Sequence, residues 1–420
     1  MTHLTLLNLA AVVVVLAAFF GYLNYHLLRL PQTIGLVVIA FFASLGAILL
    51  DRLIPGLGFA HAVETVLQLA DFDDALLKGM LGFLLFAGAL HVDMGTLVTR
   101  KWAILSMATV GVLISTAVVG VLVYVASGLL GLGIPLLYCL VFGALISPTD
   151  PVAVMGILKT IHVPPALEAK IAGESLFNDG IGVVFFTIIV VLATTAHGGT
   201  GEPVGPLLVA ELFAVEVLGG ALVGLGGGYL CYRALKSIDE HNLEVLITLA
   251  LVMALYGLAG ALHFSGPIAV VCAGLLIGNQ GTRHAMSEVT RDHVQKFWSL
   301  IDEILNAVLF LLIGFEVVAI TFSGEVALLA LAAIPIVLAA RFLGVGVPLG
   351  LLGLTQSFTK GAVPVLTWGG LRGGISVALV LSLPASPYKE PLLAVTYAVV
   401  IFSIVVQGLT IKHVVRYFVR

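Results

Sequence analysis

One stretch of the chain places two carboxyl groups, a hydroxyl and an amide within an otherwise apolar run. It covers residues 173–180 and reads Gly-Glu-Ser-Leu-Phe-Asn-Asp-Gly. An α-helix turns by about 100° per residue, so four of these side chains share an arc of about 140°: Glu174, Ser175, Asn178 and Asp179. The pattern predicts one polar face on an apolar helix, and oxygens gathered in this way are typical ligands of hard cations.

A third carboxyl group stands in a segment that cannot remain helical. Residues 147–151 read Ser-Pro-Thr-Asp-Pro, and the two prolines remove backbone donors and disfavour helix in the residues before them. The break frees the carbonyl groups around Thr149. Together with Asp150, Ser175 and Asp179, these carbonyls offer the oxygen ligands that suit an alkali cation.

One of these carboxyl groups can hold a proton instead, because burial favours the neutral form of an acid. Cation and proton would then compete for one site, which is the chemistry of an antiporter. The alternative is a buried polar network that only fixes the register of the helices. We favour the first interpretation, because a charge at the centre of a bilayer costs about 2.5–3.5 kcal/mol and such acids are usually functional.

Two arginines within apolar segments compete to neutralise Glu174. Arg341 lies in the run 339–344, Ala-Ala-Arg-Phe-Leu-Gly, and Arg372 lies in the run 369–374, Gly-Gly-Leu-Arg-Gly-Gly. A buried arginine needs a counter-charge. We expect Glu174 to pair with Arg341, and Arg372 is the competing partner. This pairing leaves Asp179 to bind and release the transported ion.

The elements that carry these residues are membrane helices. Of 420 residues, 60% are hydrophobic and 10% charged, whereas soluble domains have about 45–50% and about 25%. The net charge of −4 argues against a nucleic-acid binder, which needs a basic face. At about 20 residues per crossing, the chain leaves no room for a soluble domain. The three cysteines, Cys139, Cys231 and Cys272, lie in apolar runs and are expected to pack in the core.

Hydropathy predicts thirteen spanning segments, and none is read as a cleaved signal peptide. They run near residues 4–24, 33–50, 76–99, 102–127, 134–157, 168–195, 205–232, 243–262, 266–278, 293–320, 325–352, 361–383 and 391–411. With the N-terminus outside and the C-terminus cytoplasmic, fourteen basic residues fall on inside loops and three on outside ones. This bias follows the positive-inside rule. It places Arg100 and Lys101 in a cytoplasmic loop and the acidic segment 51–74 outside.

Two pairs of segments suggest an internal repeat. Residues 30–38 resemble 265–271, and residues 83–88 resemble 310–314. Both pairs match one helix with the seventh after it, so the copies cross the bilayer in opposite senses, as in secondary transporters. We predict inverted repeats at about 4–195 and 243–411, with a linker helix at about 205–232.

The repeat places the two interrupted segments at equivalent positions in its two halves. The break at 147–151 and the glycine run at 369–374 fall in the fifth and twelfth segments. We therefore expect a pair of crossed, broken helices near the midplane, where transporter sites lie. The plainer interpretation is a proline kink and a glycine packing patch, which leaves the charges at both breaks unexplained.

Other acidic residues in or near the predicted spans are weaker candidates for a functional role. Asp93 lies near the inner end of the third segment, while Asp302, Glu303 and Glu316 flank the tenth. They either line an ion entrance or reach the membrane interface, and the sequence favours the interface.

The two polar motifs resemble the signature of the cation/proton antiporter-1 family of sodium/proton exchangers. Similar too are Phe297-Trp298, Leu305-Asn306 and Leu309-Phe310, and the run 369–373. The resemblance covers essentially the whole chain. It implies a homodimer of thirteen-helix subunits, each with a dimerisation part and a mobile six-helix core that moves like an elevator.

The resemblance also implies roles for single residues. Asp179 would be the acid that binds the cation and carries the proton, and Asn178 its neutral neighbour. Thr149, Asp150 and Ser175 would complete the cation shell. The family's ion pair would be Glu174 with Arg341.

We therefore expect an electroneutral sodium/proton antiporter of a prokaryotic inner membrane, of the short type without a long cytoplasmic tail. It would exchange an alkali cation for a proton, lie in lipid as a homodimer and need no cofactor. A potassium- or lithium-preferring exchanger of the same fold is the alternative. A channel would need a continuous pore, and an intramembrane enzyme a motif such as H-E-x-x-H, which the chain lacks.

Overall fold

The computed structural model describes residues 6–54, 75–158, 164–198, 206–320, 323–354 and 360–419. Within these ranges the fold is all-α, as predicted, and contains no strand. The main helices are α1 (Leu6–Leu23), α2 (Gln32–Leu53), α5 (Leu81–Leu90), α6 (Met94–Ser106), α7 (Val112–Leu129), α8 (Leu136–Ile146), α9 (Val152–Leu158), α10 (Pro165–Gly198), α11 (Pro206–Leu235), α12 (His241–Ala261), α13 (Gly266–Leu276), α14 (Thr282–His284), α15 (Glu288–Phe315), α16 (Gly324–Leu352), α17 (Ala362–Trp368), α18 (Gly374–Leu381), α19 (Lys389–Phe402) and α20 (Gly408–Phe418).

Short π-helical or 3₁₀ segments join or precede several of these helices. They are η1 (Asn24–Leu28), η2 (Ala75–Met80), η3 (Met107–Gly111), η4 (Ile277–Gly281), η5 (Glu316–Ala319) and η6 (Ser403–Gln407). Eight helical stretches in the described residues are long and apolar enough to cross a membrane. Each of the thirteen predicted segments contains helix, while their number as separate membrane crossings stays a prediction.

The border between the third and fourth predicted segments was wrong. The third helix ends at Leu90, and a new helix begins at Met94 and runs through η3 to Leu129. Asn279 holds the intervening turn: its amide donates to Val92 O (3.0 Å) and accepts from Met94 N (2.8 Å). Arg100 and Lys101 therefore lie within α6 instead of in a loop.

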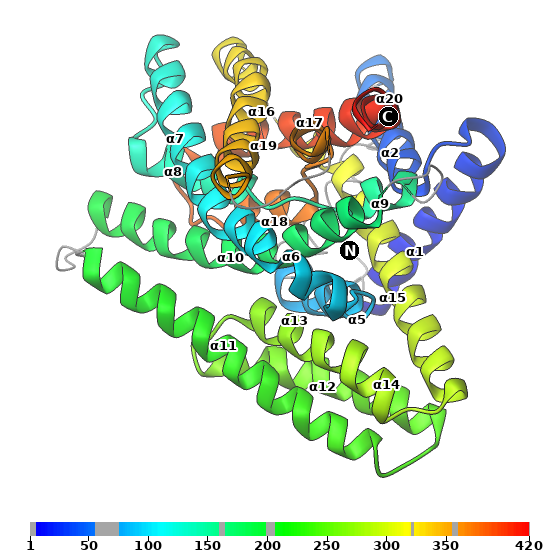
Figure 1. Cartoon of the computed structure of the whole chain (residues 1–420). Helices are drawn as coiled ribbons and strands as arrows, with labels where there is room; N and C mark the ends of the chain where they lie inside the picture. Colours follow the sequence, from blue (N-terminus) through cyan, green and yellow to red (C-terminus); the bar gives the residue numbers. More distant parts are fainter. Residues whose placement is uncertain are drawn as a thin grey trace.

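The helices pack in two groups (Figure 1). The first group contains α1, α2, α5, α11, α12, α13 and α15, which contact one another below and to the right in the view. The second contains α7, α8, α10, α16, α18 and α19, which lie above α11, α12 and α13 and to the left of α1 and α2 in the view. The segment with Glu64, Asp71, Asp73 and Asp74, predicted to be external, lies outside the described residues.

Both predicted interruptions exist in the structure. The fifth segment divides into α8 and α9 around residues 147–151, and the twelfth into α17 and α18 around residues 369–373. The two breaks touch each other, because Asp150 N donates to Leu371 O at 2.8 Å. Cys139 and Cys231 are buried, Cys272 is partly buried, and all three are free thiols.

A close helix contact sets the position of Arg341 on α16. A Cβ added at Gly344 would lie 2.8 Å from Gly111 O, nearer than real Cβ atoms approach a backbone atom. Glycine at both positions therefore lets α16 approach η3 closely. Arg341 precedes this contact by three residues and faces the interior of the second group, where it is buried.

Candidate functional site

The polar face predicted on residues 173–180 lies on α10 and is turned into the protein. Glu174, Ser175 and Asn178 are at most 1% exposed, and Asp179 is 6% exposed. A helix in the membrane presents polar side chains inward because lipid cannot hydrogen-bond to them. The face is therefore directed at other protein groups, which come from the two broken helices and from α16.

Thr149 and Asn178 connect the first break to α10. Thr149 N donates to Asn178 Oδ1 (3.3 Å), and Asn178 Nδ2 donates to Thr149 Oγ1 (2.9 Å). Ser175 Oγ donates to Thr149 O. Backbone groups that the prolines removed from the helix thus find side-chain partners, as buried backbone groups must.

Asp150 is held by both broken helices. Its Oδ1 accepts from Val152 N at 2.8 Å, which caps the start of α9, and its own N–H donates to Leu371. A Cβ added at Gly373 would lie 2.5 Å from Asp150 Oδ2. The glycine at this position therefore makes room for the carboxylate between the two breaks.

Asp179 differs from its neighbours in lacking a complete set of partners. Its Oδ1 is buried and accepts no hydrogen bond from any described residue. A buried oxygen without a donor is costly unless a ligand or a proton satisfies it, so this carboxyl group has hydrogen-bonding capacity that the described residues leave unused.

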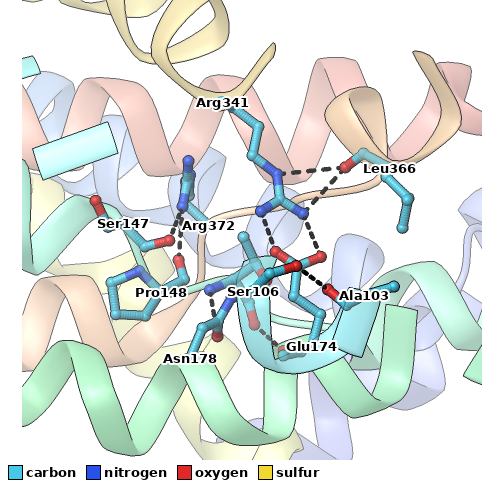
Figure 2. A network of polar contacts seen from close by, with 11 residues as sticks. Ala103, Ser106, Ser147, Pro148, Glu174, Asn178, Arg341, Leu366 and Arg372 are labelled. Carbon is cyan, nitrogen blue, oxygen red and sulfur yellow. Dashed lines mark hydrogen bonds and ion pairs between the residues drawn. The ribbon is translucent and has the colours of Figure 1, made fainter. Parts of the chain in front are cut away.

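Glu174 pairs with Arg341, and the competing arginine, Arg372, lies nearby but has other partners (Figure 2). Arg341 Nη2 donates to Glu174 Oε2 at 2.8 Å, and Nη1 donates to Oε1. The guanidinium also donates to Leu366 O through Nε (3.3 Å) and Nη2 (3.1 Å). Arg341 therefore links α10 to the end of α17, in a bidentate arrangement typical of strong arginine–carboxylate pairs.

Arg372 is almost fully buried and binds backbone carbonyls instead of Glu174. Its Nη1 donates to Pro148 O at 2.9 Å and to Ser147 O, at the end of α8. A positive charge at this place complements the carbonyl end of a helix. Its backbone N–H donates to Ser403 Oγ (2.9 Å) in η6.

Sequence reasoning missed the groups that hold the second break. Leu366 takes part through its carbonyl oxygen, which no side-chain type can signal. Ser403 Oγ donates to Gln407 Oε1 (2.7 Å), and Gln407 Nε2 donates to Trp368 O (3.0 Å). The only signal for this pair is two polar residues four apart in an apolar segment.

The candidate site therefore combines two carboxylates with neutral oxygens at the crossing of two broken helices. Asp150, Ser175, Thr149 and Asp179 come together as the sequence predicted, and Asn178 is engaged in holding the break. The available ligands are carboxylate, hydroxyl and carbonyl oxygens, which are the ligands that hard monovalent or divalent cations prefer.

The arrangement defines a class of membrane protein that comparison with solved structures identifies. The sodium proton antiporter MjNhaP1 from Methanocaldococcus jannaschii, solved at pH 8, superposes with a TM-score of 0.76, covers 97% of both chains and is 19% identical. The chain therefore has the antiporter fold.

Sequence comparison then gives the family. A family model described as sodium/hydrogen exchanger, transmembrane, matches residues 14–417. The Na(+)/H(+) antiporter NhaP of Pseudomonas aeruginosa is 45% identical over 418 residues, which are 98% of this chain and 96% of the relative. The Na(+)/H(+) antiporter NhaH of Halobacillus dabanensis is 34% identical over 393 residues, 93% and 92% of the two chains.

The chain belongs to the sodium/hydrogen exchanger family and resembles its NhaP-like members. It is a multi-pass membrane transporter. The resemblance that the two polar motifs indicated is thereby confirmed.

Proposed function

We propose that this protein is a sodium/proton antiporter that exchanges one sodium ion for one proton by alternating access. The observation that carries the proposal is the buried Oδ1 of Asp179, which has no hydrogen-bond partner among the described residues. Asp179 follows Asn178, which is hydrogen-bonded to Thr149, the residue before Asp150. The names of the relatives, Na(+)/H(+) antiporters, support the two substrates.

In the proposed cycle Asp179 binds the cation in its ionised form and releases it when protonated. Ser175, Thr149 and Asp150 supply further oxygens. When sodium leaves, a proton neutralises Asp179 and lowers the cost of a buried charge. Because cation and proton use the same oxygen atoms, each can move only in place of the other.

Asn178 supports the one-to-one ratio. It stands beside Asp179 at a position where a second carboxyl group would add a second titratable site. Its amide is directed at Thr149 through two hydrogen bonds, so it contributes no exchangeable proton. Asp150 would stay ionised throughout, as the capping group of α9.

The division of the helices into two packing groups supports an elevator-like movement. The site includes α8, α10 and α18 of the second group together with α9 and α17, which contact α10 and α16. Arg341 on α16 also ties α10 to α17. A group held together in this way can move as a unit against the first group. We further propose that the chain contains the predicted inverted repeats. We also propose that it forms a homodimer in which the first group makes the contact between subunits.

The basic residues support a prokaryotic inner membrane orientation with the C-terminus in the cytoplasm. Arg29 follows η1, Arg233 lies in the last turn of α11 with Lys236 just after it, and Arg283 lies in α14. All four would lie inside. Loops that collect lysine and arginine lie in the cytoplasm.

The test is cation-driven proton movement in proteoliposomes with sodium, lithium and potassium in turn. We expect sodium-driven exchange by the wild type and none by Asp179→Asn. Asp292→Asn is the matched control: this acid is exposed on α15 and pairs with Lys296 at 2.7 Å, away from the site, so exchange should be retained. Movement with potassium or lithium but not with sodium would favour the alternative selectivity, and no exchange with any cation would overturn antiport.

A further inference from the structure

Asp302 lies in the middle of α15, in the first helix group, and its function is not explained by the site already described. It is half-buried, and the next residue, Glu303, is exposed. Asn306, one turn later, is 4% exposed. Its Nδ2 donates to Asp302 O (2.9 Å) and to Asp302 Oδ1 (3.0 Å). The carboxylate is thus held in a fixed direction by a buried amide.

The face of α15 that carries these residues meets the second broken helix. Leu309 follows Asn306 by three residues, and a Cβ added at Gly374 would lie against Leu309 Cδ1. Gly373, the residue before, is the one that makes room for Asp150 Oδ2. Two adjacent glycines of the break therefore contact α15 on one side and Asp150 on the other.

This geometry places Asp302 about 10 Å along α15 from the contact at Leu309, because seven residues of helix rise about 10 Å. Asp302 and Leu309 lie on the same face of α15, because seven residues make almost two full helical turns. Burial increases from the half-buried Asp302 and Asp150 to Asp179, which is 6% exposed. The three carboxylates form a series that leads from partly exposed to buried.

The position of α15 is fixed in the first group. Trp298 is fully buried, packs on Phe86 with ring centroids 4.6 Å apart and donates from Nε1 to Thr248 Oγ1 (3.0 Å). Ser299 bonds to His91 Nε2 at 3.0 Å. Asp302 is therefore carried by an anchored helix, while Asp150 belongs to the other group.

We propose that Asp302, oriented by Asn306, captures the alkali cation on the cytoplasmic side and passes it to Asp150. The inference rests on the proposed function and on the proposed orientation, in which α15 begins in the cytoplasm. A carboxylate at this place raises the local concentration of cations in front of the site. Asp302 and Asp150 belong to different helix groups, so their separation changes when one group moves against the other. We therefore expect Asp302 to raise the sodium affinity of the state that opens to the cytoplasm and not that of the state that opens to the outside.

The neighbouring Glu303 provides the matched control. It carries the same charge on the adjacent position but lines a cavity of about 810 Å³ between α1 and α15, together with residues such as Ala17, Gly21 and Arg29. Its carboxylate is thus directed to another part of the molecule. Glu303→Gln removes the same charge without changing the face toward Asp150.

The experiment measures the KM for sodium separately at the two membrane faces, in everted and in right-side-out vesicles. For Asp302→Asn we expect KM at the cytoplasmic face to rise about five- to tenfold, because the carboxylate that concentrates cations in front of the site is lost. The KM at the outer face and the maximal rate should be unchanged. Asp302→Glu should restore most of the affinity, and Glu303→Gln should resemble the wild type.

Ionic strength gives an independent readout. The Debye length falls from about 30 Å at 0.01 M to about 8 Å at 0.15 M, so the difference between wild type and Asp302→Asn should shrink as choline chloride is added. Asn306→Ala should cause a smaller rise in KM at the same face. An equal change at both faces, a fall in maximal rate with KM unchanged, or an equal effect of Glu303→Gln would overturn the inference. Absence of exchange by the wild type would instead overturn the proposed function.

Discussion

Asn178 and Thr149 are joined by two hydrogen bonds, one in each direction, at 2.9 and 3.3 Å. Through this pair α10 is attached to the break between α8 and α9. In the proposed elevator-like movement, the polar face of α10 would therefore move with the broken helix, and Asp179 would keep its position relative to Asp150. The amide of Asn178 acts as a structural element of the site.

The first prediction concerns this pair. Asn178→Ala leaves Thr149 N and Oγ1 buried without partners, which should lower the free energy of unfolding by about 1–3 kcal/mol. Thermal unfolding in detergent measures the effect. Thr187→Val is the control on the same helix, since the Thr187 hydroxyl only bonds back to Val183 O at 2.9 Å on an exposed face. Equal stability of both variants would contradict the role of Asn178.

The second prediction concerns Glu174 and Arg341. Removing one partner of a buried ion pair leaves the other unpaired at a cost of about 3–5 kcal/mol. Glu174→Gln and Arg341→Ala should therefore each lower thermal stability or expression as well as transport. Arg283→Ala is the comparison, because Arg283 and Asp93 form an exposed pair at 2.9 Å that should contribute about 0–1 kcal/mol.

If both variants were as stable as the wild type and only ion affinity changed, Glu174 and Arg341 would belong to the binding site. A double-mutant cycle separates the two cases, since residues in contact show a coupling energy that distant ones lack.

The third prediction is the orientation. In a variant without the three native cysteines, Leu53→Cys at the end of α2 should react with an impermeant thiol reagent only from outside. Leu53 is 68% exposed. Ser237→Cys, between α11 and α12, should react only from the cytoplasmic side. Labelling of both positions from one side would show that the helix count between them is wrong.

Most of the fold followed from the sequence because each helix carries its own signal. Apolar length marks the spans, and Pro148, Pro151 and the glycines at 369–374 mark the breaks. Boundaries that depend on a distant residue carried no such signal. The turn after Leu90 is held by Asn279, which is 187 residues away from Val92, and hydropathy extended the helix through it.

The candidate site was predictable where chemistry resides in side chains. The polar face with Asp179 follows from residue type and spacing. The sequence favoured Arg341 over Arg372 as the partner of Glu174, and the structure decides between them. The contact of Arg341 with Leu366 O and that of Arg372 with Pro148 O do not, because every residue has a carbonyl and only the tertiary fold decides which one is near. Asp302 is a similar case. The sequence favoured a position at the membrane interface, and only the structure shows that hydrogen bonds from Asn306 orient its carboxylate.

The last prediction concerns stoichiometry. With Asn178 directed at Thr149, Asp179 is the one acid of the proposed site that alternates between cation and proton. The loaded site then carries the same charge in both directions, and the cycle moves no net charge. Exchange in proteoliposomes should therefore proceed at the same rate with and without an imposed potassium-diffusion potential.

Asp150 is the residue that would contradict this result. It lies beside Asp179 and is half-buried, and a second proton on it would make the cycle electrogenic. A rate that depends on the potential would show that this proton moves. The comparison of Asp150→Asn with wild type then shows whether Asp150 carries this second proton. If it does, the residual exchange of the variant should no longer depend on the membrane potential. If Asp150 only caps α9 through Val152 N, the variant should lose sodium affinity and stability, with the potential still without effect.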